Sequence, residues 1–413
     1  NMTVYTELQA DIRILTTGLS VQTDADGEAD YVLAYDIGTT TVVAYLMDGH
    51  SGKLLSQSSC QNPQGQYGAD VISRIQYVLQ TGSEEMSGCI RKCMQQLAAE
   101  AAQKAGITTD KIGTSAIVGN TAMHHLLLGI DPHPLVTPPY MPAVFEALEL
   151  EKGARILPNI AGFVGADTVG CMVSTRFDRM EDLTLLIDIG TNGEMVLGNS
   201  KRRIACSTAA GPAFEGAKIS CGMRGAAGAV DHVWVEDGKI RYHVIGEEAP
   251  EGLCGSGLLD LVAVLLRQGI LDESGYLENK EFTLCDNVTL TQKDIREVQL
   301  AKAAIRAGIE LMCVHLGVQP EDIQTVLLAG AFGNYMDPRS ACRISMIPPV
   351  LLDRIRPIGN AAGEGAKLCA VSAERYEYSK KLAAETEFLE LASRPEFQDY
   401  FVDALEFCEE DDE

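Results

Sequence analysis

The sequence predicts an α/β protein built from two related domains, and three observations support this prediction. The chain has 413 residues, which is more than a single hydrophobic core usually serves. A unit of strand, turn and strand occurs twice, around Asp36 and around Asp188, which lie 152 positions apart (188 minus 36). Segments with helical periodicity alternate with these strands. A repeated unit implies two domains of related architecture that face one another.

The first half begins with a polar segment and then a hairpin. Residues 1–30 are typical of a linker or of the remnant of an upstream domain, because they are polar and end in a stretch rich in Asp and Gly. Apolar runs at 31–35 and 41–46 flank the first turn and predict a β-hairpin. Apolar residues recur every three or four positions from about Glu84 to Lys104, which predicts an amphipathic helix.

The second half repeats the hairpin and adds helices. Strands are expected at 183–187, 194–197 and 325–328, and helices at 257–268, at 291–316 and, as the final helix, from about Asn360. Thr291 and Asp294 form a capping box for the second helix, and Gly317 provides its C-terminal stop. We therefore expect the chain to divide into residues 31–182, residues 183–408 and a solvated acidic tail at 409–413.

The composition argues against several classes of protein and of binding partner. The net charge of −25 argues against a nucleic-acid partner, because phosphate backbones would be repelled. The best candidates for a membrane span, such as Leu258–Leu266, are about half the length that crosses a bilayer. The N-terminal residues do not resemble a signal peptide, and the 12 cysteines occur singly without a CxxC pair. We expect a cytoplasmic protein with reduced thiols and no membrane partner.

The two repeated turns have the residues that bind a triphosphate. Gly38 lets the first turn approach phosphates closely, and Thr39, Thr40 and Thr41 offer hydroxyl and N–H groups to phosphate oxygens. Asp36 cannot bind a phosphate directly, but it can hold a hydrated Mg²⁺. The second turn presents the same groups, and its residues are Asp188, Gly190, Thr191, Asn192 and Gly193. One such turn is most often a plain β-turn, whereas two copies between strands predict a clamp around ATP.

These motifs resemble the superfamily of acetate and sugar kinases, Hsp70 and actin. Five segments resemble its motifs in the same order; they are 36–41 (phosphate-1), 162–168 (connect-1), 188–193 (phosphate-2), 327–334 (adenosine) and 358–366 (connect-2). The resemblance implies the two-lobed, actin-like ATPase fold of duplicated ribonuclease H-like domains. It also implies that small residues in connect-2 let two helices cross closely.

The resemblance implies further site residues. Asp167 could orient the attacking water or bind the metal, or it could simply be a helix N-cap. Glu215 and Lys218 fall where the superfamily contacts the ribose, although a surface ion pair is an alternative. The adenosine motif has Gly-Ala where a Gly-Gly pair is usual, and its residues are Gly330, Ala331, Phe332 and Gly333.

A narrower resemblance covers about residues 30–408. The segments 61–75, 118–125, 211–224 and 252–260 look like those of the ATP-dependent reductive activators of corrinoid proteins. Membership would imply an ATP hydrolase that uses ATP to drive corrinoid cobalt from Co(II) to Co(I) for methyl transfer. The partners implied are a corrinoid protein of a methyltransferase system and a ferredoxin-like electron donor. We expect the 2Fe–2S cluster only on a missing domain or a separate protein, because the C-x4-C-x2-C spacing is absent.

Several alternatives stay open at this point. The loop at 217–224 could face the corrinoid, with Ser220 or Met223 near cobalt, or it could be a plain structural loop. A small-molecule kinase or another ATPase on the same scaffold is the main alternative function. The sequence does not fix the oligomeric state, and a homodimer stays open.

Overall fold

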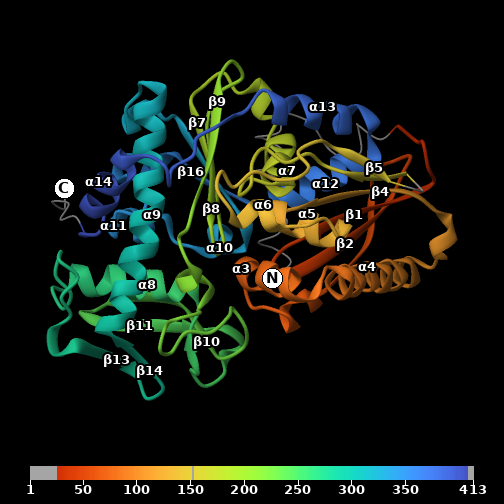
Figure 1. The fold of residues 1–413 in the computed structure, drawn as a ribbon. Helices are drawn as coiled ribbons and strands as arrows, with labels where there is room; N and C mark the ends of the chain where they lie inside the picture. The colour runs from red at the N-terminus through yellow and green to blue at the C-terminus, as the bar shows by residue number, and fades with distance from the viewer. Residues whose placement is uncertain (1–25, 151–152, 408–413) are drawn as a thin grey trace. The chain divides into compact units, whose positions relative to one another are not determined.

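The computed structural model describes residues 26–150 and 153–407, which form two compact units (Figure 1). The first unit comprises the residues up to 181, residues 199–205 and residues 360–388, and the second comprises the remainder. Most of the expected linker at 1–30 and the whole acidic tail at 409–413 lie outside the described residues. The expected division at residue 182 stays a prediction, because the compact units exchange segments of the chain.

The first unit is built on a six-stranded sheet with the order β3-β2-β1-β4-β6-β5. The first three strands pair antiparallel, β4 lies parallel to both β1 and β6, and β5 pairs antiparallel with β6. The strands are β1 (Tyr31–Ile37), β2 (Thr41–Asp48), β3 (Leu54–Gln61), β4 (Ile112–Gly119), β5 (Leu148–Leu150) and β6 (Ala154–Ile156). The predicted hairpin is therefore present, with both strands two residues longer than expected.

Helices cover both faces of this sheet (Figure 1). On one face α4 (Glu84–Ala105) buries its predicted apolar positions, including Met86 and Ile90, in a core shared with Leu33 and Ile37 of β1. The opposite face packs against α12, which explains the nearly continuous apolar run of β1. The remaining helices of this unit are α3 (Val71–Thr81), α5 (Thr121–Leu128), α6 (His133–Val136), α7 (Ala166–Ser174), α12 (Ala361–Val371) and α13 (Ala373–Ala384).

The second unit contains most of another six-stranded sheet, with the order β16-β15-β7-β8-β9-β17, and two small sheets, β11-β10-β12 and β13-β14. Strand β17 and the first residues of β9 fall in segments that belong to the first unit. The large sheet contains β7 (Thr184–Ile189), β8 (Gly193–Gly198), β9 (Arg203–Thr208), β15 (Thr325–Ala329), β16 (Ile355–Gly359) and β17 (Glu387–Phe388). The small sheets contain β10 (Ala229–Glu236), β11 (Lys239–Val244), β12 (Gly252–Leu253), β13 (Glu281–Cys285) and β14 (Val288–Thr291).

The two large sheets share one plan, which is the duplication predicted from the repeated turn. In each, an antiparallel hairpin is followed by a third strand at its outer side, and a later strand lies parallel to the first strand. Strands β7, β8, β9, β15 and β16 thus correspond to β1, β2, β3, β4 and β6. This arrangement confirms the predicted α/β fold class.

The helices of the second unit test the expected boundaries. The long helix α9 has the predicted capping box of Thr291 and Asp294, and Gly317 ends it in a left-handed conformation. A helix begins near Asn360 as expected, since Asn360 is the N-cap of α12, but it is not the final helix, because α13 and α14 follow it. The buried face of α13 includes the polar residues Arg375 and Ser379, so its apolar residues alone give only a weak helical pattern. The helices are α8 (Gly255–Arg267), α9 (Gln292–Leu316), α10 (Gly330–Tyr335), α11 (Pro338–Arg343) and α14 (Pro395–Asp403).

Short 3₁₀ turns connect many of these elements. Of these, η1 (Pro63–Gln66) lies beside the first repeated turn and η5 (Pro212–Glu215) beside the second. The others are η2 (Thr109–Lys111), η4 (Phe177–Arg179), η6 (Ile245–Glu247), η7 (Glu278–Lys280), η8 (Pro320–Asp322) and η9 (Pro349–Arg354).

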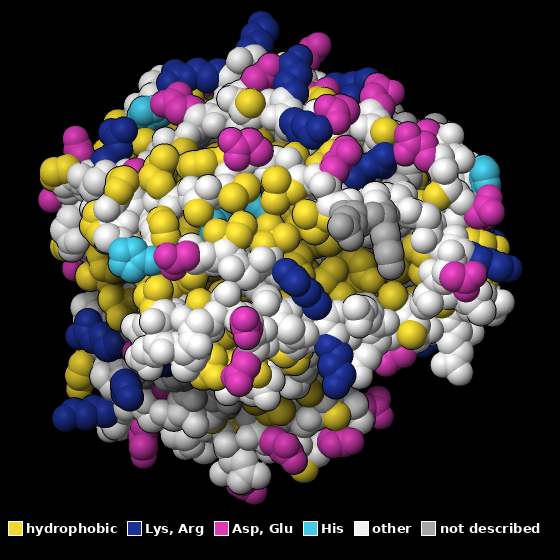
Figure 2. Space-filling view, turned by 45° about the vertical axis from the view of Figure 1, so that its right-hand side comes forward, with side chains coloured by type: hydrophobic (Ala, Val, Ile, Leu, Met, Phe, Trp, Pro, Cys, Tyr) yellow, Lys and Arg dark blue, Asp and Glu magenta, His cyan; other side chains and the backbone are white. Residues whose placement is uncertain are grey.

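Surface charge and helix length can be compared with the expectation that neither nucleic acid nor a membrane is a partner. Acidic and basic side chains are interspersed on the face that Figure 2 shows, and no continuous basic patch lies there. None of the helices in the described part of the chain has the length and apolar character needed to cross a membrane.

Candidate functional site

The first repeated turn has an unusual hydrogen-bond pattern. Strands β1 and β2 pair as far as Ile37 and Val42, and the N–H of Gly38 donates to the carbonyl of Thr41 at 2.9 Å. A Cβ atom at position 38 would lie only 2.9 Å from that carbonyl oxygen, which explains the glycine. The carbonyls of Gly38, Thr39 and Thr40 accept hydrogen bonds from elsewhere in the unit.

The donors to these three carbonyls come from two residues. Asn62 donates its side-chain amide to Gly38 at 2.8 Å and its backbone N–H to Thr40 at 2.8 Å. Arg74 donates to the carbonyl of Thr39 at 2.6 Å. Within the described residues, the N–H groups of Thr39 and Thr40 have no acceptor. Successive open N–H groups in a turn form a concave site that favours an anion.

Asp36 lies just before this turn in a partly buried position. Its Oδ2 accepts a hydrogen bond from Asn360 at 2.7 Å, and Asn360 also donates to the hydroxyl of Tyr45 at 3.2 Å. Burial raises the pKa of Asp36, and the bond from Asn360 opposes part of that rise. No basic side chain of the described chain forms an ion pair with Asp36. A partly buried carboxylate of this kind fits a hydrated Mg²⁺, which needs only one or two carboxylates.

The second turn, in the other unit, is similar but shorter. Strands β7 and β8 pair as far as Ile189 and Gly193, so three residues form the turn instead of the four at 38–41. Gly190 donates its N–H to the carbonyl of Asn192 at 2.9 Å, and the carbonyl of Thr191 accepts from the N–H of Gly211 at 2.9 Å. The N–H groups of Thr191 and Asn192 have no acceptor among the described residues.

Two further predicted segments lie beside this second turn. The hydroxyl of Thr191 donates to Oε1 of Glu215 at 2.6 Å, so Glu215 belongs to this site. Strand β15 pairs parallel with β7 and brings Ala329 next to Asp188. Gly330 follows with a φ of +81°, and a Cβ there would lie 2.4 Å from Oδ1 of Asp188. The structure therefore brings Asp188, Glu215 and the start of the adenosine motif together.

The aromatic residue of the adenosine motif contacts a partner that the sequence did not indicate. The ring of Phe332 stacks on that of Phe214, with centroids 4.9 Å apart and planes 14° apart. Gly255 lies against the backbone of Phe214 and the ring of Phe332, since a Cβ there would be 2.0 Å from the carbonyl oxygen of Phe214 and 3.0 Å from Cδ2 of Phe332. Lys218 is exposed on the same loop and has a positive φ of +64°.

The start of α7 settles one alternative for Asp167. The N-cap of α7 is Gly165, so the N-cap reading of Asp167 is wrong. Asp167 lies in the first turn of the helix, where its Oδ1 accepts the N–H of Thr168 at 2.8 Å. Gly165 packs against the backbone of Asn120, whose side chain donates to the hydroxyl of Thr39 at 3.0 Å. The helix that carries Asp167 thus begins near the first turn.

The predicted close crossing of two helices is present in the first unit. A Cβ at Gly365 of α12 would lie 2.0 Å from the carbonyl oxygen of Gly170 of α7, and a Cβ at Gly170 would lie 2.9 Å from that of Ala362. Only glycine allows this approach. The crossing places Asn360, the N-cap of α12, beside Asp36.

The two residues considered for contact with the corrinoid both form hydrogen bonds with other residues of the second unit. Ser220 is exposed, but its N–H donates to the buried carboxylate of Asp294 at 2.7 Å and its hydroxyl to the same oxygen at 3.1 Å. The N–H of Met223 donates to the carbonyl of Leu253 at 2.8 Å. These bonds hold the loop in a defined conformation, and the role of the two side chains stays a prediction.

Sequence reasoning missed the residues that support the first turn. Asn62, Arg74 and Asn120 all fall in segments that carried the family resemblance, yet no role could be assigned to them from the sequence. Asn360 lies in the connect-2 motif, where attention fell on the small residues. Their polar side chains reach the turn only through tertiary packing, for which the sequence contains no periodic signal.

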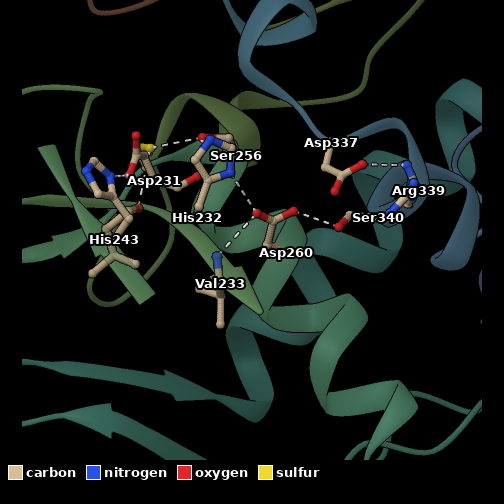
Figure 3. Close-up of polar contacts among 11 residues, drawn as sticks. Asp231, His232, Val233, His243, Ser256, Asp260, Asp337, Arg339 and Ser340 are labelled. Atoms are coloured by element: carbon tan, nitrogen blue, oxygen red, sulfur yellow. Dashed lines mark hydrogen bonds and ion pairs between the residues drawn. The ribbon is translucent and has the colours of Figure 1, made fainter. Parts of the chain in front are cut away.

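A second polar cluster lies in the second unit (Figure 3). The buried carboxylate of Asp260 on α8 accepts from the hydroxyl of Ser340 at 2.6 Å and lies 3.1 Å from Nδ1 of His232. The bond to Asp260 raises the pKa of His232, and partial burial opposes that rise. These contacts join β10, α8 and α11. Within the described residues no group of three or more His, Cys, Asp or Glu side chains could hold a metal ion.

Comparisons with known proteins match nearly the whole chain to one family. A family model described as the RACo middle region matches residues 31–180, and a model of the C-terminal ASKHA domain of RACo matches residues 182–413. The solved structure of a reductive activator for a corrinoid, iron–sulfur protein is similar with a TM-score of 0.81 and 36% identity, and the match covers 93% of this chain and 67% of that one. The match to an ASKHA domain confirms the predicted actin-like ATPase fold.

Two curated relatives have related descriptions. The corrinoid activation enzyme RamQ of Eubacterium limosum is 38% identical over 414 residues, which covers 90% of this chain and 69% of RamQ. The Co(II) methylated amine-specific corrinoid protein reductase of Methanosarcina barkeri is 29% identical over 276 residues. That match covers 60% of this chain and 51% of the reductase, so the chain matches only about half of the second relative.

Proposed function

Because this chain belongs to the RACo family of reductive activators of corrinoid proteins, we propose that it uses ATP to drive the cobalt of a corrinoid protein from Co(II) to Co(I). The proposal that the chain binds ATP depends on the pair of hairpin turns. Each turn has an aspartate two residues before a glycine, and each has two N–H groups without an acceptor among the described residues. Each of these turns offers groups that suit a phosphate.

The proposed nucleotide site divides its tasks among the residues of both turns. The open N–H groups of Thr39, Thr40, Thr191 and Asn192 bind phosphate oxygens, with Thr41 and Gly193 completing the turns. Mg²⁺ supplies charge neutralisation for the phosphates. Asp36 and Asp188 hold this ion through its water ligands, as hard carboxylate oxygens commonly do.

The remaining predicted residues act at the two ends of the nucleotide. Glu215 and Lys218 contact the ribose, and residues 330–333 surround the adenosine. The bond from Thr191 supports this assignment, because it fixes the carboxylate of Glu215 beside the second turn. Asp167 orients the attacking water from the first turn of α7, and its carboxylate is held there by the N–H of Thr168.

Coupling to cobalt requires that nucleotide binding change the affinity of the chain for one state of the corrinoid protein. Such coupling is a free energy shared by two sites, and it acts in both directions. The exposed loop at 217–224 is the proposed corrinoid-facing segment, with Ser220 or Met223 nearest the cobalt. The electron comes from a ferredoxin-like 2Fe–2S donor, either on another domain or on a separate protein.

ATP hydrolysis by the chain, with and without a purified Co(II) corrinoid protein, tests the proposal. We expect the corrinoid protein to stimulate phosphate release, and Asp188→Ala to abolish the stimulated rate. Glu281→Ala is the matched control, because Glu281 is an exposed acid on β13 in the same unit. Absorption of Co(I) is followed in parallel, with a low-potential chemical reductant as the source of electrons.

The outcomes separate the parts of the proposal. Stimulation that is lost in Asp188→Ala but retained in Glu281→Ala supports the activator function. Steady hydrolysis that does not respond to the corrinoid protein would refute the coupling while the ATPase fold stands. ATP consumption that appears only with an added small acceptor, with the phosphate transferred to that acceptor and not released, would favour a small-molecule kinase.

A further inference from the structure

Arg74 is a buried arginine directly behind the first turn. It lies on α3, and only 2% of its surface is exposed. Its Nε donates to the carbonyl of Gly68 at 2.9 Å and its Nη2 to the carbonyl of Thr39 at 2.6 Å. The remaining nitrogen, Nη1, lies 3.4 Å from the sulfur of Met123, which is a weak acceptor.

The charge of this guanidinium is not compensated locally. In the part of the chain that the structure describes, no carboxylate lies within ion-pair distance of Arg74. Burial lowers the pKa of Arg74, and the more distant carboxylate of Asp70 opposes the lowering. An arginine stays protonated even in such surroundings. A buried positive charge without a partner is costly, which suggests that an anion completes its surroundings when bound.

The need to fold the hairpin does not by itself explain why a buried arginine is present at position 74. In the second turn the carbonyl of Thr191 is held by a backbone N–H, and among the described residues no cationic side chain is bonded to that turn. The same strand, turn and strand therefore form without a buried arginine. The charge of Arg74 is then available for a role that the second turn does not require.

The geometry of the peptide links Arg74 to the open N–H groups. In a trans peptide the N–H of one residue points opposite to the carbonyl of the residue before it. The carbonyls of Gly38 and Thr39 are held by Asn62 and Arg74, so the N–H groups of Thr39 and Thr40 point the other way. Fixing the carbonyls on one side thus presents two donors on the other.

We propose that Arg74 is a positioning residue for the phosphates of the nucleotide. Its guanidinium fixes the first turn through the carbonyl of Thr39, and its uncompensated charge strengthens the attraction of that turn for an anion. This inference rests on the proposed function, since the anion is the polyphosphate of ATP. Asn62 shares the positioning task but contributes no charge.

Calorimetric titration of the full chain with MgATP and, separately, with adenosine tests this role. Arg74→Met removes the donors and the charge, so MgATP should bind about tenfold more weakly or worse, while adenosine binding is unchanged. Arg74→Lys keeps the charge but loses the two-pronged geometry, so we expect an intermediate loss for MgATP. Arg91→Met is the matched control, because Arg91 also donates to a backbone carbonyl in the first unit, that of Leu127 at 3.0 Å.

Amide exchange provides a readout that a purely structural role would not change. MgATP should slow the exchange of the Thr39 and Thr40 amides in the unmodified chain, and this protection should be reduced in Arg74→Lys. If Arg74→Met fails to fold, Arg74→Lys decides: unchanged affinity for MgATP and unchanged protection would overturn the inference.

The remaining outcomes separate the inference from the function on which it rests. If the unmodified chain does not bind MgATP, the proposed function fails. If it binds MgATP and Arg74→Met binds it equally well, the inference alone is overturned. An equal loss for MgATP and adenosine in Arg74→Met would also overturn it, because the role would then be structural.

Discussion

The two hairpin turns have nearly the same sequence but different supports. The first turn has four residues and depends on side chains from three other elements, Asn62, Arg74 and Asn120. The second has three residues and depends on a backbone N–H and on Glu215 from one nearby loop. Both nevertheless present two N–H groups without an acceptor in the described chain. Similar local sequences thus define the hairpin, whereas tertiary partners define how each turn is held.

The largest expected effect concerns the helix crossing that places Asn360 beside the first turn. In Gly365→Ala the new Cβ would lie 2.0 Å from the carbonyl oxygen of Gly170, so α12 must shift. We expect the free energy of unfolding to fall by about 3 kcal/mol, as in overpacked cores. Chemical denaturation measures this loss, and the affinity for MgATP should fall with it because Asn360 moves away from Asp36.

A second glycine in a helix of the same unit gives the control. Gly88 lies in α4, where a Cβ would meet no atom within 4 Å. Gly88→Ala should therefore stabilise the chain by about 0.4–1 kcal/mol. If Gly365→Ala were as well tolerated as Gly88→Ala, the close crossing would not be needed to support the first turn.

The next prediction compares the two turns directly by removing one hydroxyl from each. Thr191→Val removes a hydrogen bond to the carboxylate of Glu215, whereas Thr39→Val removes a neutral bond from Asn120. Bonds to charged groups contribute about 1.5–3 kcal/mol and neutral ones about 1 kcal/mol. We expect MgATP to bind about tenfold more weakly to Thr191→Val and only about threefold to fivefold more weakly to Thr39→Val.

Titration calorimetry at a single salt concentration measures both affinities. An equal loss in the two variants would mean that the turns are held alike, and would remove the distinction between them. A larger loss in Thr39→Val would reverse the order of importance.

The sequence predicted the parts of this site that depend on local pattern. Apolar runs around Asp36 and Asp188 predicted both hairpins, and the resemblance of the segment around Gly365 to the connect-2 motif implied a close helix crossing. The supports of the turns could not be predicted, because Arg74 is a single charged residue in an amphipathic helix. Its burial depends on how α3 packs against a turn 35 positions away. The sequence likewise could not show that the first turn is one residue longer, since strand register follows from pairing.

The smallest expected effect concerns the aspartate of the first turn. Burial raises the pKa of Asp36 above its ordinary value of 3.8, so ionisation is less favourable in the folded chain than in the unfolded one. This penalty is absent below the ordinary value, grows between that value and the raised pKa, and is complete above the raised pKa. Without nucleotide, Asp36→Asn should therefore unfold with a higher free energy than the unmodified chain at pH 7. The difference should close toward pH 4.

Asp48, at the other end of β2, gives a control with the opposite sign. Hydrogen bonds from Ser51 lower the pKa of Asp48, so its ionised form favours the folded chain. Asp48→Asn should lower stability at pH 7, and that loss should fade as the pH falls through the lowered pKa. Thermal unfolding of both variants between pH 4 and pH 8 checks the two signs. If Asp36→Asn were also destabilised at pH 7, the carboxylate would already be compensated in the free chain, and the first turn would not depend on a bound cation to stabilise it.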